Sequence, residues 1–212
     1  GALVLNGVGK WNGTAWEALG TGLGGTFPHG RALAVDDSDD VYVGGLFTTA
    51  GGVTSPDIAK WDGSGWSALG NGSNGTINAV AVDGADVYVG GTFSAMGVVS
   101  ANKVARWDGS AWSALGSGLG TVNQVVNSLA VSSGGTVYAA GSFTSSGGLP
   151  VNGIAEWSGA VWNEVGGGLD GPGTTCAFDT AGNLYVGGAF ETAGAVSARN
   201  IAKWNLLTTT WT

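Results

Sequence analysis

Residues 41–47 read VYVGGLF and residues 58–69 read IAKWDGSGWSAL, and these two stretches decide the fold because both recur along the chain. The first motif returns as VYVGGTF, VYAAGSF and LYVGGAF, at 87–93, 137–143 and 184–190. The second motif is a pair of tryptophans around a turn, and it uses all 10 tryptophans of the chain. Self-similarity at a fixed spacing is the signature of a repeat protein, and here the period is about 47 residues.

Each repeat predicts four short strands. The first strand is the apolar run 32–35, the second carries the Tyr-Val-Gly-Gly motif, the third is IAKW at 58–61, and the fourth is WSAL at 66–69. Between the last two strands, Asp62-Gly63 supplies the left-handed backbone that a two-residue hairpin loop requires. This loop places Trp61 opposite Trp66, a cross-strand aromatic pair that contributes up to about 1 kcal/mol.

Four antiparallel strands in each repeat of this length predict an all-β fold, a β-propeller whose blades stack radially around a central channel. We expect residues 1–212 to form one domain, in which the large aromatic side chains fill the spaces between blades. The predicted parts are an N-terminal half-blade at 1–20 and four full blades at 31–70, 77–116, 126–166 and 174–212.

The half-blade leaves a strand edge without a partner. Because unpaired edges invite pairing with other chains, residues 1–20 are expected to dock against further sequence, to pair with another copy, or to close a ring with residues 201–212. The array is therefore expected to be part of a longer one, or to be completed by assembly.

Composition and charge narrow the classes of partner. The chain has 15 acidic and 7 basic residues and a net charge of -8, which disfavours phosphate backbones and anionic lipids. We therefore expect no nucleic-acid binding. Membrane insertion is not expected either, because no apolar run is long enough to cross a bilayer. The sole cysteine, Cys176, replaces an aliphatic residue of the first strand and is expected to be a buried small hydrophobe.

The motif VYVGGxF followed by IAKWDGSGWSALG resembles a kelch repeat. More closely, WDGSxWSALGxG with AVDxxxxVYVGGxF is similar to the repeats of Rax2-like cortical polarity markers of fungi and of secreted or surface-anchored bacterial repeat proteins. The resemblance covers the whole chain and implies a kelch-like propeller that serves as an extracellular or cell-surface interaction module.

Catalytic chemistry is not expected. The chain has one histidine, His29, placed by the repeat alignment in an inserted loop, and a single imidazole makes no metal site by itself. Propeller glycosidases need two carboxylates that face each other across the channel. The residues that enter the channel here are expected to be Arg31, Asn78, Asn127 and Thr174, none of which is acidic.

One turn carries a weak metal signal. Asp36, Asp37, Asp39 and Asp40 supply hard oxygen ligands of the kind that calcium prefers, so calcium is the one cofactor considered. The equivalent turns of the other three repeats lack such a cluster, which favours an ordinary hairpin turn. Otherwise no cofactor, metal or catalytic residue is predicted.

The leading hypothesis is therefore a non-enzymatic extracellular or cell-surface module that presents loops on a rigid scaffold for recognition or adhesion. One alternative is a structural subunit of a surface layer or filament, completed by strand pairing between copies. Another is a multivalent lectin, disfavoured because the repeat core claims every tryptophan. The expected partners are thus a protein or glycan on a cell surface, or copies of the chain itself.

Overall fold

The structure of this chain, a computed structural model, describes residues 4–212, which form strands and turns without a helix. Four four-stranded antiparallel sheets follow one another, each with its strands in chain order. The first blade contains β4 (His29–Val35), β5 (Val41–Leu46), β8 (Ile58–Trp61) and β9 (Trp66–Ala68). The second contains β10 (Ile77–Asp83), β11 (Asp86–Gly91), β14 (Val104–Trp107) and β15 (Trp112–Ala114).

The third and fourth blades repeat this plan. The third contains β16 (Val126–Val131), β17 (Val137–Gly141), β20 (Ile154–Trp157) and β21 (Trp162–Glu164). The fourth contains β22 (Gly173–Phe178), β23 (Leu184–Gly188), β26 (Ile201–Asn205) and β27 (Thr210–Trp211). The predicted all-β fold of four-stranded propeller blades is confirmed.

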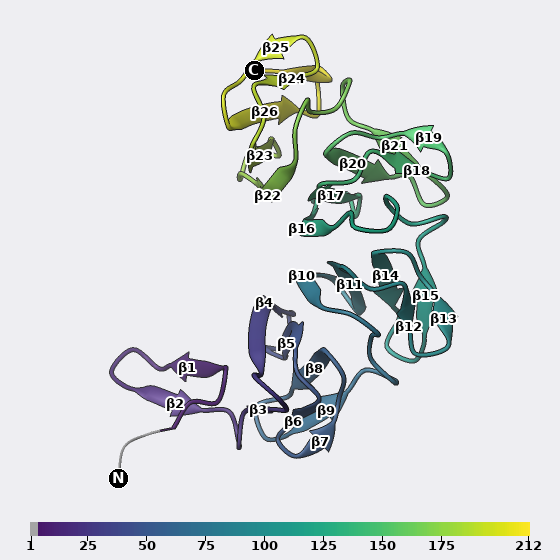
Figure 1. The fold of residues 1–212 in the computed structure, drawn as a ribbon. Coiled ribbons are helices and arrows are strands. Elements are labelled where there is room, and N and C mark those ends of the chain that lie inside the picture. Colours follow the sequence, from purple (N-terminus) through teal and green to yellow (C-terminus); the bar gives the residue numbers. More distant parts are fainter. Residues whose placement is uncertain (1–3) are drawn as a thin grey trace.

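A two-stranded half-blade precedes the first blade. It consists of β1 (Gly9–Trp11) and β2 (Trp16–Ala18), and within residues 4–212 no further strand joins this sheet. Figure 1 shows the blades as an open arc, with the half-blade at one end and the fourth blade at the other. Ring closure between residues 1–20 and 201–212, one of the three expected completions, is therefore wrong for this structure.

The connections between the second and third strands of each blade are small hairpins that the sequence did not reveal. In the first blade β6 (Thr49–Ala50) pairs with β7 (Val53–Thr54), and β6 also pairs with β3 (Leu23–Gly24). The later counterparts are β12 (Ala95–Met96) with β13 (Val99–Ser100), β18 (Ser145–Ser146) with β19 (Leu149–Pro150), and β24 (Thr192–Ala193) with β25 (Val196–Ser197). Strands of two residues carry too little periodicity to be recognised from sequence.

The tryptophan pairs connect neighbouring blades. Trp61 lies opposite Trp66, as predicted, with ring centroids 5.4 Å apart. The carboxylate of Asp62 accepts hydrogen bonds from the Ser64 hydroxyl and from the amides of Ser64 and Gly65, which lowers the pKa of Asp62 to about 2. In the four full blades the second indole of the pair donates its N–H to a carbonyl of the preceding repeat: Trp66 to Leu19, Trp112 to Leu69, Trp162 to Leu115 and Trp211 to Gly166.

Tyrosines fill the spaces between blades. Tyr42 of the first blade belongs to the same buried cluster as Val80 and Val87 of the second. Tyr88 and Tyr138 take the equivalent places in the next two interfaces. Tyr185 of the fourth blade has no following blade among the described residues and is 39% exposed. The interblade role predicted for these side chains is therefore confirmed at each internal interface.

Two tryptophans depart from this pattern. Trp11 and Trp16 of the half-blade are paired with each other, yet they are 52% and 54% exposed. The expectation that the repeat core buries all tryptophans is wrong for this pair, because no earlier repeat covers it in the structure. The argument against a lectin, which depended on that expectation, loses its force at this hairpin.

The residue before the third strand has left-handed backbone in every full blade. Asp57 has φ 63°, and the equivalent positions are Lys103, Gly153 and Asn200. The Asp57 side chain is buried, and its carboxylate accepts hydrogen bonds from the Phe47 amide at 3.1 Å and from the Ser73 hydroxyl at 3.0 Å. Burial raises the pKa of Asp57 above its usual value, although these two hydrogen bonds oppose the shift.

This burial predicts a pH-dependent stability. Below the ordinary pKa of 3.8 the carboxyl is protonated in both states, whereas above its raised folded pKa the buried charge destabilises the fold. We therefore expect Asp57→Asn to raise the free energy of unfolding at pH 7 by about 1 kcal/mol. The asparagine Oδ1 can still accept from the Phe47 amide, while its Nδ2 donates to the Ser73 hydroxyl, whose own proton goes to the Gly75 carbonyl. Asn200 shows that this backbone accepts asparagine. Urea denaturation between pH 3 and 7 should show the difference shrinking as pH falls; a constant difference would contradict the assignment.

Candidate functional site

The face toward the propeller axis is built by β-bulges. The register of the first two strands shifts at Arg31, and equivalent shifts occur at Asn78, Asn127 and Thr174. A bulge re-aims a side chain, and these four residues line a shared cavity of about 400 Å³. The predicted channel-lining residues are thus brought together, and the bulge that displays them was not foreseen.

Hydrogen bonds join these residues from blade to blade. Arg31 donates to the Asn78 side chain at 3.3 Å, Asn78 donates to the Val126 carbonyl at 3.5 Å, and Asn127 donates to the Gly173 carbonyl at 2.9 Å. The lining of this cavity carries one cation, two amides and a hydroxyl. A pair of facing carboxylates, as glycoside hydrolysis requires, is not part of it.

The acidic turn uses its carboxylates locally. Asp36 accepts hydrogen bonds from the amides of Ser38 and Asp40, and the Tyr42 hydroxyl donates to it at 3.2 Å. Asp40 forms an ion pair with Lys60. Asp37 and Asp39 are exposed, and among residues 4–212 no group of three or more His, Cys, Asp or Glu residues is placed to hold a metal ion. Calcium binding at this turn stays a prediction.

The two other residues considered for chemistry lie apart. Cys176 is buried in the cluster between the third and fourth blades, as predicted, and burial raises the pKa of its thiol to about 11. His29 is the first residue of β4 rather than part of a loop, because β4 continues past the bulge and pairs His29 with Leu46. Its Nδ1 lies 2.6 Å from the Phe27 carbonyl oxygen.

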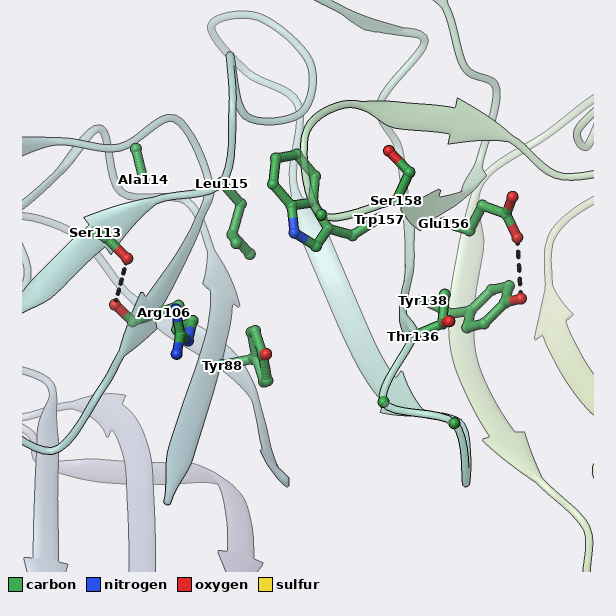
Figure 2. A pocket seen from close by; sticks show the side chains of 13 residues that line it. Tyr88, Arg106, Ser113, Ala114, Leu115, Thr136, Tyr138, Glu156, Trp157 and Ser158 are labelled. Atoms are coloured by element: carbon green, nitrogen blue, oxygen red, sulfur yellow. Dashed lines mark hydrogen bonds between the residues drawn. The ribbon is translucent and has the colours of Figure 1, made fainter. Parts of the chain in front are cut away.

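A polar cavity of about 620 Å³ lies between the second and third blades, and it is the strongest candidate for a binding site. Its walls combine a cation with aromatic rings and small turn residues. Figure 2 shows Tyr88 and Arg106 from the second blade on one side and Trp157 of the third blade across from them. The side chains that matter chemically are Tyr88, Arg106, Ser113 and Trp157; Tyr138 and Glu156 border the cavity, but their side chains pair on the fourth-blade side of the third blade.

Strand register sets the charges of this cavity. In each blade the tyrosine lies opposite the residue that precedes the third-strand tryptophan: Lys60, Arg106, Glu156 or Lys203. The sign along this row changes between Arg106 and Glu156. Glu156 pairs with Tyr138 on the fourth-blade side of its sheet, so Arg106 is the charge that faces this cavity. A ligand here would meet the Arg106 cation on one blade and the Trp157 ring on the next.

Each charged group has a partner. Arg106 Nε lies 2.8 Å from an Asp86 carboxylate oxygen, although its N–H is not directed at that oxygen, and the side chain is 39% exposed. The Tyr138 hydroxyl donates to Glu156 at 3.0 Å (Figure 2), and burial together with the Glu156 charge raises the pKa of Tyr138. These contacts orient the side chains before a ligand arrives, which reduces the entropy lost on binding.

The sequence did not point to this cavity. Its cation, Arg106, stands at a repeat position that is also basic in two other blades, as Lys60 and Lys203. The two glycines of the turn Gly134-Gly135 add open space at the cavity wall. Neither feature stands out before the blades are placed side by side.

No family model matches the sequence, and no curated protein matches it either. Solved structures do resemble it. The structure of YCF48 bound to a D1 peptide matches with a TM-score of 0.54 and 15% identity, over 99% of this chain and 61% of that one. A GH74 xyloglucanase from Xanthomonas campestris matches with a TM-score of 0.58 and 14% identity, over 98% of this chain and 34% of that one.

These likenesses support the propeller fold and nothing finer, because both identities are low. The chain spans less than two thirds of either matching structure. Within the described residues, no helix is long and apolar enough to span a membrane.

Proposed function

We propose that this chain is a non-enzymatic interaction module of an extracellular or cell-surface protein, built from kelch-like repeats, and that it binds a protein partner. The observation that carries the proposal is the cavity between the second and third blades, where Arg106 presents its charge across from Trp157 on rigid strands. A propeller that binds a peptide, YCF48, is among the structures of similar fold.

The groups in the cavity suit recognition better than catalysis. The hydroxyl of Ser113 donates to the Arg106 carbonyl at 3.3 Å, and the chain's one histidine is in the first blade. Glu156 is the only carboxylate among the residues that line this cavity, so a second one is lacking for acid–base work. Oriented polar groups beside aromatic rings are typical of protein interfaces.

The proposal predicts a charge-dependent interaction. Peptides selected against the purified chain from a random display library should include acidic ones that contact Arg106. For these, Arg106→Glu should weaken binding about tenfold or more, because it replaces attraction by repulsion. The matched control is Arg199→Glu, the same change at an exposed arginine of the fourth blade. Selected peptides that respond equally to both changes, or to neither, would contradict this site.

A second candidate is a self-assembling subunit, favoured by apolar side chains exposed on the first blade beside the half-blade and on the fourth blade at the end of the arc. Leu33 of the first blade and Ile201 of the fourth are 59% and 63% exposed. Light scattering across a range of concentrations separates the candidates, because an interaction module that acts alone stays monomeric.

A further inference from the structure

Three of the four buried clusters contain a tyrosine that belongs to the preceding blade. The remaining cluster, that of the first blade, contains none. Tyr42, Tyr88 and Tyr138 occupy the interfaces between full blades. The cluster of the first blade is built from the same repeat positions, including Leu19, Val41 and Trp61, but without a tyrosine. Its missing member would come from the inner strands of the half-blade, which are not among residues 4–212.

A cavity of about 450 Å³ marks the place of that tyrosine. Its apolar lining consists of the repeat counterparts of the residues that surround Tyr42 one interface later. Leu19, Leu33, Val35, Val41 and Trp61 correspond in order to Leu69, Val80, Val82, Val87 and Trp107. We call these first five residues the tyrosine socket.

Exposure at the tyrosine socket shows what its occupant would cover. Leu33 is 59% exposed, whereas its counterpart Val80, packed in the cluster with Tyr42, is 9% exposed. Val35 is exposed as well, while its counterpart Val82 is partly buried in that cluster. Both blades have apolar side chains at these positions. The difference in exposure therefore comes from the neighbouring blade, which supplies a tyrosine in one case and none in the other.

The edge of the half-blade is ready to receive a strand. β1 is paired with β2 alone, whereas the equivalent β8 is paired on both edges. In the first blade, Tyr42 lies opposite Lys60, whose Nζ is 5.5 Å from the centre of the ring. Lys10 holds the Lys60 position in the half-blade and borders the socket.

We propose that the tyrosine socket and the free edge of β1 together bind a β-hairpin whose second strand carries the pattern aliphatic-Tyr-aliphatic-Gly-Gly, with the tyrosine opposite Lys10. The interface would continue the one that the chain already forms three times between its own blades. Backbone hydrogen bonds to β1 supply affinity and the socket supplies specificity, as in strand addition to a sheet edge. The inference does not depend on the proposed function.

An intact second copy does not offer such a strand. In every blade the tyrosine strand is the second of four and is paired on both sides, so it cannot add to another edge. The occupant is therefore a hairpin that is not yet part of a blade.

The first test uses a labelled peptide of residues 77–91, INAVAVDGADVYVGG, and fluorescence anisotropy with the full chain. We expect saturable binding that weakens about tenfold or more when the peptide carries Tyr88→Ala or when the chain carries Leu33→Asp. Leu33 is exposed, so the substitution leaves the fold intact. The matched control is Leu207→Asp, at a leucine that is 94% exposed in the fourth blade, and it should not change binding.

An isolated hairpin is only marginally stable, so a second measurement joins the hairpin to the chain. Residues 77–103 are copied in front of Val8 in place of residues 1–7, which reproduces the order of strands in a full blade. We expect slower amide hydrogen exchange at residues 8–11 and 33–35, and a higher melting temperature. The same graft with its tyrosine replaced by alanine should lose most of the protection around Leu33.

Two results would overturn the proposal. One is a graft that leaves exchange at residues 8–11 and 33–35 unchanged, which would show that the face does not accept the hairpin. The other is self-association of the unmodified chain that protects these same residues, which would assign the face to a second copy instead.

Discussion

Replacing Trp112 by alanine should lower the free energy of unfolding by about 3–5 kcal/mol, the range typical of truncating a buried tryptophan. Its indole is 8% exposed and belongs to the cluster between the first two full blades. It also donates to the Leu69 carbonyl at 2.8 Å, so its loss leaves that carbonyl without this partner. Urea denaturation followed by tryptophan fluorescence measures the change, and a smaller denaturant dependence would show that blades had uncoupled.

The half-blade supplies the control for this prediction. Trp16 holds the same repeat position but is 54% exposed, so Trp16→Ala should cost about 1 kcal/mol or less. Trp112→Phe should fall between the two, because it retains the ring but loses the hydrogen bond, worth about 1 kcal/mol. Equal losses at Trp112 and Trp16 would mean that the indoles stabilise their own hairpins rather than the contact between blades.

These interblade contacts are also what the sequence predicted best. The spacing of Trp61 and Trp66 around Asp-Gly predicted the hairpin and its register. A two-residue turn allows the flanking residues to pair in only one register. The regular return of the tyrosine predicted a side chain that fills each gap. Local turn chemistry and hydrophobic pattern point to the same structure here, so single residues could be placed correctly.

Other features depend on neighbours that a repeat pattern does not reveal. The bulge at Arg31 inserts one residue into a strand without changing the composition of that strand. The sequence therefore identified the residues that line the channel, but not the bulge that turns them toward it. Trp16 and Trp112 look alike in sequence, and only the position of the half-blade at the end of the arc exposes the former. The cavity between Arg106 and Trp157 is formed by side chains of two blades, so it exists only once the blades are stacked.

The second large effect is expected at a glycine that faces the next blade. A Cβ at Gly90 would lie 2.4 Å from Val126 Cγ1, too close for either atom, and the backbone of Gly90 is not in the left-handed region. Gly90→Ala should therefore destabilise the fold by about 1–3 kcal/mol through overpacking alone. Denaturant unfolding measures it, with Gly65→Ala as control: Gly65 has open space around it, and its counterpart is Ala111.

The chain itself contains the compensating pair. Where the third blade has Ala140 at the position of Gly90, the facing residue of the fourth blade is Gly173 instead of Val126. Val126→Gly alone should also destabilise, because it leaves a cavity, but the double variant should regain part of both losses. We expect a favourable coupling of about 1 kcal/mol or more in the double-mutant cycle. Additive losses would mean that these two residues do not set the distance between blades, and that glycine is required at position 90 for another reason.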